Sequence, residues 1–147
     1  MNYIQKIELI HNSNTSPELL TLLASDEDVC VRECVAQNPN TPPETLTLLA
    51  KGESYYVRRR VASNPNTPPE TLTILATDKD PDVRWYVTLN PNTPPETLAL
   101  LASDKDPCVR YYVARNPNTP QYVKDYLIAR NFMENCASIK TVYSTLV

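Results

Sequence analysis

The chain is organised around one phrase that returns every 26 residues. The phrase NPNTPPETL begins at Asn38, Asn64 and Asn90, a shorter NPNTP begins at Asn116, and a looser NSNTSPELL begins at Asn12. The second half of each unit also repeats, as VCVRECVAQ, YYVRRRVAS, PDVRWYVTL and PCVRYYVAR. Because no insertion breaks this register, the sequence predicts identical structural modules stacked on one another.

The first half of each unit predicts a short helix. In the third unit, Thr67 and Glu70 have the spacing of a capping box, and Pro68 is expected at the first helical position. One apolar face follows at i, i+3 and i+4, with Ile74 beside it. The residues of this face are Leu72, Leu75 and Ala76. We expect the helix to end near residues 76–77.

The second half predicts another helix. Asp80 is a suitable N-cap, Pro81 falls at the first helical position, and the helix runs to about Leu89. Its inward-facing residues are Val83 and Val87. We expect Asn90 to close the helix in the left-handed conformation.

Two helices in 26 residues bury too little apolar surface to fold alone, so the units must stack. The 14 prolines set against one glycine act as regular punctuation between helices. The sequence therefore predicts an all-α solenoid of helix pairs, forming a single domain over residues 1–147. Residues 1–11 form an N-terminal cap, residues 12–115 four full repeats, and residues 116–147 a partial repeat with a C-terminal cap. The closing helix is expected to contain Tyr122, Val123, Tyr126 and Leu127.

The combined pattern D-x-D-x-x-V-R-x-x-V-A-x-N-P-N-T-P-P-E-x-L-x-x-L-A resembles the leucine-rich repeat variant family of bacteria. It appears as DKDPCVRYYVARNPNTP over Asp104–Pro120 and as NPNTPPETLTILA over Asn64–Ala76. The resemblance extends over about residues 12–130. It implies a right-handed superhelix of alternating α and 3-10 helices, similar to HEAT and armadillo solenoids, and implies little about function.

Some members of that family carry an N-terminal cysteine cluster that holds an iron–sulphur centre. The four cysteines of this chain do not fit such a cluster, so no cofactor is predicted. They are Cys30, Cys34, Cys108 and Cys136. Cys30 and Cys34 lie one helical turn apart, but zinc needs four ligands and His11 is the only histidine. We interpret them as reduced thiols.

Composition restricts the function further. The net charge of −3 gives no general attraction to nucleic acid or to acidic membranes. The first residues, MNYIQKIELI, do not resemble a signal peptide, and no apolar run approaches the ~20 residues of a membrane span, so we expect a cytoplasmic protein. A glycine-rich phosphate loop, a histidine-based dyad and a carboxylate pair outside caps and loops are all missing, which indicates a protein that is not an enzyme. Some HEAT-like solenoids are enzymes, so catalysis remains the third alternative.

An arginine occupies the same place in every unit. These arginines are Arg32, Arg58, Arg84 and Arg110. An aspartate precedes three of them by six residues, and Gly52 replaces the fourth; the aspartates are Asp26, Asp78 and Asp104. A position that is identical in every unit serves stacking more often than recognition. We interpret the column as a structural Asp–Arg ladder like that of HEAT repeats, in preference to a row of phosphate or carboxylate contacts.

Variable positions on the second helices are better candidates for function. The helix face opposite the valines contains five aromatic residues and three arginines in the last three units, and these residue types dominate binding hot spots. The predicted partner-binding residues are Tyr56, Arg59, Trp85, Tyr111 and Arg115. Whether Tyr86 and Tyr112 are exposed or belong to the core is left open. We predict a protein-binding scaffold; the alternative is a solenoid that binds nucleic acid through stacking and backbone contacts.

Overall fold

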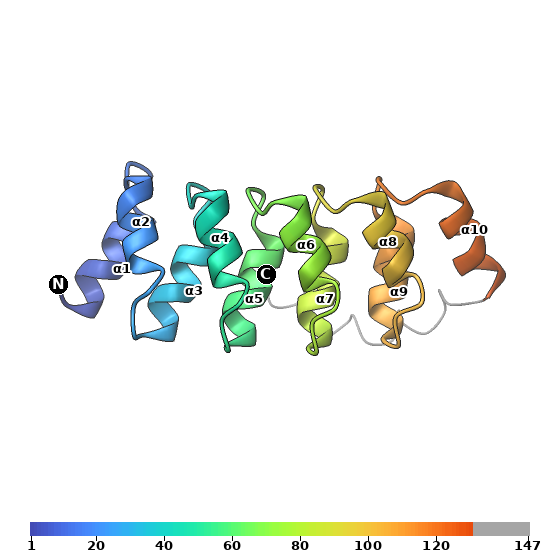
Figure 1. Cartoon of the computed structure of the whole chain (residues 1–147), viewed down its shortest axis with the longest axis horizontal. Helices are drawn as coiled ribbons and strands as arrows, with labels where there is room; N and C mark the ends of the chain where they lie inside the picture. The colour runs from blue at the N-terminus through green and yellow to red at the C-terminus, as the bar shows by residue number, and fades with distance from the viewer. Residues whose placement is uncertain (131–147) are drawn as a thin grey trace.

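The computed structural model describes residues 1–130, which form ten α-helices and no strand. In chain order they are α1 (Tyr3–His11), α2 (Pro17–Leu23), α3 (Val29–Gln37), α4 (Pro43–Leu49), α5 (Tyr55–Ser63), α6 (Pro69–Leu75), α7 (Pro81–Leu89), α8 (Pro95–Leu101), α9 (Pro107–Arg115) and α10 (Gln121–Ala129). The helices succeed one another along one axis (Figure 1). The predicted all-α solenoid is confirmed.

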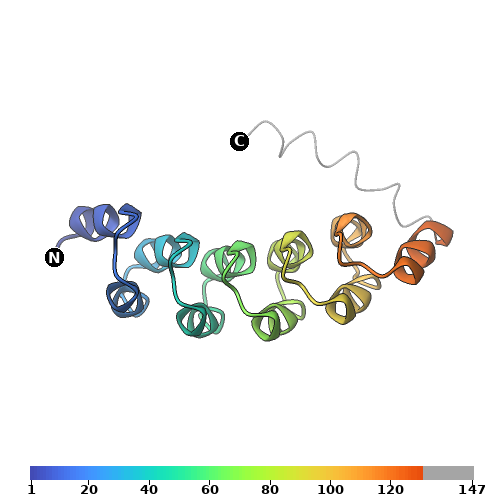
Figure 2. The same cartoon turned by 90° about the horizontal axis from the view of Figure 1, so that it is seen from above.

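The helices form two rows. Figure 2 shows α1, α3, α5, α7 and α9 in one row and the even-numbered helices α2 to α8 in the other, with the array bent gently toward the odd-numbered row. Consecutive odd-numbered helices pack directly against each other, whereas the even-numbered helices pack mainly against odd-numbered ones. The odd-numbered row therefore lies on the inner side of the arc.

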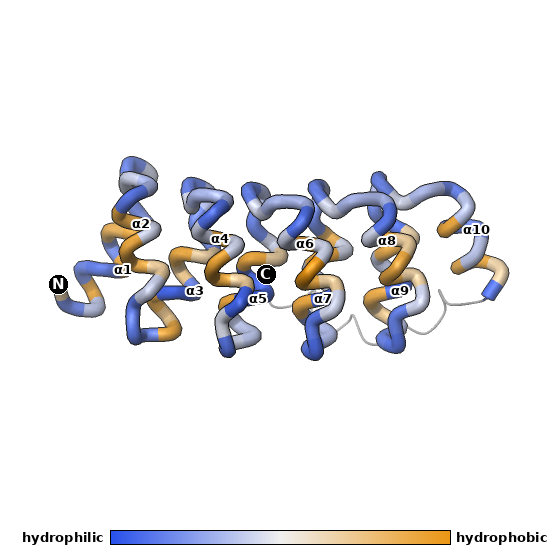
Figure 3. Tube along the Cα trace, in the orientation of Figure 1, coloured by the Kyte–Doolittle hydropathy of each residue, from blue (hydrophilic) through white to orange (hydrophobic). Residues whose placement is uncertain are grey.

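The hydrophobic core lies between the two rows and uses the same positions in each unit. In the third unit, no core leucine or valine is more than 2% exposed. These residues are Leu72, Leu75, Val83 and Val87, as the periodicity predicts. Ile74, by contrast, is exposed. Figure 3 shows hydrophobic residues along the middle of the array and hydrophilic residues along its two loop edges.

Both helices of each unit are α-helices. The second helices contain nine residues and the first helices seven. The alternation with 3-10 helices that the family resemblance implies is therefore wrong for these units. The reason is visible at the start of α7, where the N–H of Arg84 already bonds the carbonyl of Asp80, four residues back.

The N-cap of the second helix is as predicted, and that of the first helix is not. Asp80 caps α7 with its side chain and Pro81 is the first helical residue. The capping box at Thr67 is wrong, because α6 begins at Pro69 with Pro68 as its N-cap. The hydroxyl of Thr67 instead donates to the carbonyl of Val61, at 2.5 Å. It adds a second donor to this carbonyl in the last turn of α5, which also accepts a hydrogen bond from the N–H of Asn64.

The repeated asparagines connect successive units. Asn90 is extended (φ −74°, ψ 126°), so the predicted left-handed conformation is wrong. Its Nδ2 donates to the carbonyls of Ala62 and Asn64 in the preceding unit, at 2.8 and 3.0 Å. Its Oδ1 accepts a hydrogen bond from the N–H of Asn92. Asn90 is only 2% exposed. Its side chain therefore links the C-terminal end of α5 to the turn that follows α7, inside the protein.

The arginine column is a ladder between units. The guanidinium of Arg58 binds both carboxylate oxygens of Asp78, at 2.6 and 3.0 Å. Arg84 binds Asp104 in the same way, at 2.7 and 2.9 Å. The prediction of a structural ladder is confirmed, but the predicted partners are wrong. With Asp78, six residues earlier, Arg84 bonds only the backbone carbonyl. The carboxylate that pairs with Arg84 belongs to Asp104, 20 residues later. The pair therefore ties each unit to the next.

The ladder should make stability fall at acid pH. Burial raises the pKa of Asp78, but hydrogen bonds from Arg58 and from the backbone N–H of Asp80 outweigh burial and hold that pKa below its ordinary value. A carboxylate with a lowered pKa stabilises the fold above its unfolded pKa of about 3.9, and the contribution is lost as pH falls through the folded pKa. We expect the Tm, followed by circular dichroism, to fall below about pH 4, and to fall less steeply in Asp78→Asn. An equal slope in both proteins would contradict this.

The two ends differ from the inner units. Helix α1 packs on α3 in the place where a preceding unit would put its second helix. In α10, the inward residues Val123 and Leu127 are buried, while Tyr122 and Tyr126 are exposed. The rest of the predicted C-terminal cap, with Cys136, lies outside the described residues. Within residues 1–130, every helix is too short or too polar to span a membrane.

Candidate binding face

The solvent-facing side of α3, α5, α7 and α9 forms one surface along the inner side of the arc, which we call the concave face. It consists of the second, fifth, sixth and ninth residues of each helix, opposite the buried valines. They are Cys30, Glu33, Cys34 and Gln37 on α3; Tyr56, Arg59, Arg60 and Ser63 on α5; Asp82, Trp85, Tyr86 and Leu89 on α7; and Cys108, Tyr111, Tyr112 and Arg115 on α9. This face therefore changes in chemistry along the array, while the core beneath it does not.

Aromatic rings form a continuous group over α7 and α9. The ring centroids of Trp85 and Tyr86 are 4.7 Å apart, and those of Trp85 and Tyr112 are 5.6 Å apart. Tyr111 and Tyr112 follow at 5.3 Å with nearly perpendicular rings. Edge-to-face contacts of this kind stabilise aromatic pairs and restrict the motion of each ring. The group is thus ordered before any partner binds.

Two guanidinium groups lie over tyrosine rings at either side of this aromatic group. The Cζ atom of Arg59 is 5.0 Å from the ring centroid of Tyr56, and that of Arg115 is 4.6 Å from the centroid of Tyr111. Cation–π contact of this kind holds a guanidinium against the face of an aromatic ring. The two pairs therefore place a positive charge beside a tyrosine ring on α5 and on α9.

One carboxylate on the concave face neutralises part of this positive charge. Glu33 accepts a hydrogen bond from Nε of Arg60 at 2.9 Å and lies 3.8 Å from Nη2 of Arg59. This ion pair was not among the predicted contacts. The repeat does contain a signal for such contacts. Glu33 is the fifth residue of α3, and Arg60 is the sixth residue of α5, the next second helix. Trp85 and Tyr112 occupy the same two positions on α7 and α9.

The five predicted partner-binding residues all lie on the concave face. Tyr56 is 45% exposed and Arg115 is exposed, whereas Arg59, Trp85 and Tyr111 are partly buried. The structure joins Tyr56 to Arg59 and Tyr111 to Arg115, and Trp85 contacts α9 through Tyr112. Trp85 also packs against the hydrophobic core, so it serves both the stack and the surface. Tyr86 and Tyr112, left open above, are partly buried too.

Two ionisable residues of this face have pKa values above their ordinary range. Burial, followed by repulsion from Asp80, raises the pKa of Asp82, and Arg59 opposes this shift. Burial is also the main cause that raises the pKa of the Cys34 thiol. Cys30 and Cys34 are free thiols. Within residues 1–130, histidine, cysteine and acidic side chains form no group of three or more that could hold a metal ion.

The opposite side of the array contrasts with the concave face. There each first helix exposes one aliphatic residue at the same place, and these are Leu22, Leu48, Ile74 and Leu100. Glu18, Glu44, Glu70 and Glu96 are exposed beside them in the first turn. Because these positions hardly vary between units, the outer side offers a uniform surface with little power to select a partner.

The central units of the chain match a known protein family. A family model described as the Leucine Rich Repeat Variant domain matches residues 32–87 and again residues 58–112. The two matches are offset by one repeat length, so together they span the units that build the central part of the concave face. No curated protein and no solved structure matches the chain significantly.

Proposed function

Because this chain belongs to the leucine-rich repeat variant family and folds as a helical repeat array, we propose that it is a non-catalytic scaffold that binds a partner protein along its concave face. The observation that carries the proposal is the ordered aromatic and arginine group on α5, α7 and α9. Tyrosine, tryptophan and arginine supply most of the binding energy at protein interfaces, because they combine large apolar area with directed hydrogen bonds.

The distribution of variability supports the same proposal. The residues that connect units are nearly constant, whereas the fifth position of the second helix is Glu33, Arg59, Trp85 and then Tyr111. Stacking alone gives no reason for a different residue in each unit. A partner with its own uneven surface does, since each unit then meets a different part of it.

Nucleic acid is the second candidate, and the charge on the face makes it weaker. Arg59 and Arg60 lie beside Glu33, and Asp82 follows on the next helix. A backbone of phosphates would meet carboxylates as well as guanidinium groups there, whereas a protein surface with both charge signs would fit. Affinity capture with and without nuclease separates these two candidates.

The test uses a variant that changes only the concave face. We expect Tyr56→Ala with Tyr111→Ala to lower the amount of captured partner about tenfold or more, because two ring anchors are removed. Trp85 is left unchanged, since it packs against the core and its loss would also lower stability. The captured protein is quantified by mass spectrometry from native lysate, and the Tm is expected to change by no more than a few degrees.

The matched control changes two residues of the outer side, Ile74→Ala with Leu100→Ala. Both are more than half exposed, at 59% and 56%, so this variant should retain the partner. Equal loss of binding in both variants, or loss of every partner after nuclease treatment, would overturn the proposal.

A further inference from the structure

The arginine–aspartate ladder is interrupted at one rung. Arg32 stands where Arg58 and Arg84 stand in later units, and its Nη1 still donates to the carbonyls of Asp26 and Glu27, at 2.6 and 2.9 Å. The place of the carboxylate partner is taken by Gly52. Within residues 1–130, no carboxylate lies within salt-bridge distance of Arg32.

The interruption changes the surroundings of the guanidinium. Arg58 and Arg84 are only 7% and 5% exposed, because an aspartate covers each of them. Arg32 is more exposed. Its Nε and Nη2 groups, which bind the carboxylate at the other rungs, donate to no acceptor in the described part of the chain. The edge of the guanidinium that pairs with a carboxylate at the other rungs is thus left without that ligand.

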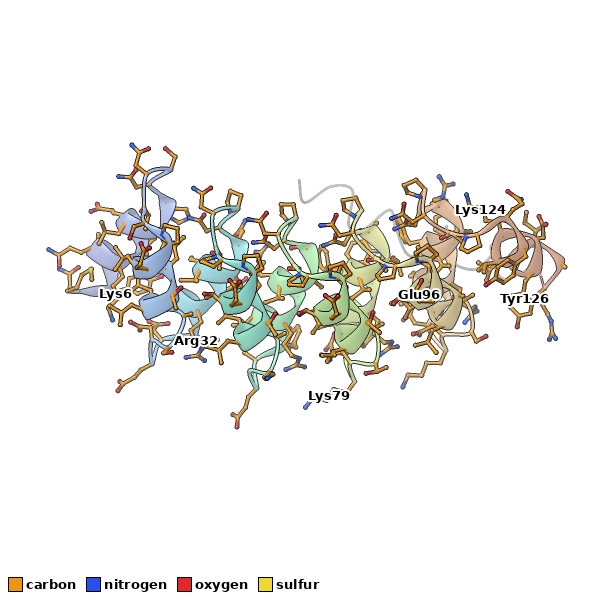
Figure 4. The ribbon with its side chains drawn as sticks, turned by 45° about the horizontal axis from the view of Figure 1, so that its top comes forward. Lys6, Arg32, Lys79, Glu96, Lys124 and Tyr126 are labelled. Carbon is orange, nitrogen blue, oxygen red and sulfur yellow. The ribbon has the colours of Figure 1, made fainter. Side chains whose placement is uncertain are left out.

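A cavity of about 210 Å³ lies where that ligand would be. Arg32, Gly52 and two serine hydroxyls, Ser25 and Ser54, line its polar side. Its remaining lining is aliphatic, from Ala24, Leu48, Leu49 and Val57. Figure 4 shows Arg32 on the lower edge of the array, the edge on which Lys79 also lies. The cavity therefore combines one cation, two hydroxyls and an apolar wall on a loop edge.

We propose that this cavity is a binding site for a carboxylate on a short aliphatic stem. The carboxylate pairs with Nε and Nη2 of Arg32 in the two-point geometry that Asp78 and Asp104 adopt at the intact rungs. The stem lies against the aliphatic wall, and the serine hydroxyls can donate to the carboxylate oxygens. The source is either a small free acid or an acidic side chain of a bound protein. The site is separate from the concave face, so this inference is independent of the proposed function.

The decisive variant is Gly52→Asp, which supplies the missing carboxylate from the chain itself. A Cβ atom at Gly52 would lie 3.2 Å from the carbonyl oxygen of Leu49, a tight contact. The same backbone turn carries an aspartate in the next unit, at Asp78. There the N–H of Asp78 bonds the carbonyl of Leu75 at 3.1 Å, and the N–H of Gly52 bonds the carbonyl of Leu49 at the same distance. Gly52→Asp should therefore fold, raise the Tm, and close the site.

The probe is propionate, compared with sodium chloride at equal ionic strength and with neutral propionamide. At a concentration about ten times its Kd, propionate should raise the Tm of the wild-type protein by about 3 °C. It should also shift the Nε–Hε signal of Arg32 in an NMR spectrum. Gly52→Asp and Arg32→Gln should show neither response. A response that persists in Gly52→Asp, or no response in the wild-type protein, would overturn the proposal.

The chain offers a matched gain-of-function control. Asp78→Gly should create a second empty rung at Arg58, and propionate should raise the Tm of this variant more than that of the wild-type protein; an equal rise would count against the proposal. A peptide whose only carboxylate is one glutamate side chain distinguishes the sources. Binding at least tenfold tighter than propionate indicates an acidic side chain of a protein, and equal binding indicates a free acid.

Discussion

Replacing Arg84 by alanine is expected to lower the free energy of unfolding by about 4 kcal/mol. The side chains of Arg84 and Asp104 are only 6% and 7% exposed and meet through two hydrogen bonds. Without the guanidinium, the largely buried carboxylate of Asp104 loses two hydrogen bonds and the charge that pairs with it. A buried charge that has lost its partner is costly, because neither water nor a counterion stabilises it. Urea denaturation followed by circular dichroism measures the loss.

Two control variants separate the loss of the pair from the loss of packing. Arg84→Ala combined with Asp104→Ala should be less destabilising than Arg84→Ala alone, because no unpaired carboxylate remains. Arg32→Ala should cost clearly less than Arg84→Ala, since Arg32 has no carboxylate partner among residues 1–130 to leave behind. If the double variant is less stable than Arg84→Ala, the penalty comes from lost packing and the ladder is not its cause.

Replacing Asn90 by alanine is expected to lower the free energy of unfolding by about 3 kcal/mol. Its Nδ2 group satisfies the carbonyls of Ala62 and Asn64, at the C-terminal end of α5. Carbonyls in the last turn of a helix have no partner within that helix, and both Ala62 and Asn64 are buried. Alanine would leave the carbonyl of Ala62 buried without its donor, whereas the carbonyl of Asn64 would keep the N–H of Thr67. The measurement is the same urea titration.

Asn92 gives the matched control for Asn90. It also donates to a carbonyl of the preceding unit, that of Pro65, at 2.6 Å, but it is exposed. Water can replace its amide, so Asn92→Ala should cost no more than about 1 kcal/mol. Similar losses in the two variants would show that burial of the hydrogen bond does not set the energy.

These interactions matter for function because they fix the concave face. Arg58, Arg84 and the asparagines hold successive units at one spacing and angle, so rings on neighbouring helices meet, as Trp85 and Tyr112 do. The proposed partner protein would then encounter a preformed surface and lose less conformational entropy on binding. We expect some variants of the arginine–aspartate pairs or of the asparagines to fold and yet loosen the contacts between units. Those that fold should therefore weaken partner binding indirectly, in proportion to how far they loosen these contacts.

The sequence by itself determined the features that lie within one unit. The 26-residue period, the all-α class, the N-cap at Asp80 and the buried pair Val83 and Val87 follow from local rules: proline and aspartate set the start of the second helix, and apolar spacing sets its buried side. The sequence also located the variable face on the second helices. Even within a unit, a local rule failed where a neighbour competed, since Thr67 bonds the preceding helix and does not cap α6.

Only the tertiary structure decided how one unit meets the next. It showed that Arg84 binds the aspartate 20 residues later, that Asn90 is extended and reaches back into the preceding unit, and that Trp85 lies between core and surface. It also revealed that the absent carboxylate at Gly52 leaves a cavity beside Arg32. The physical reason is that periodicity specifies the direction of a side chain within its own helix. The translation and rotation between units arise from all the contacts between them together. This geometry decides which side chains of neighbouring units meet.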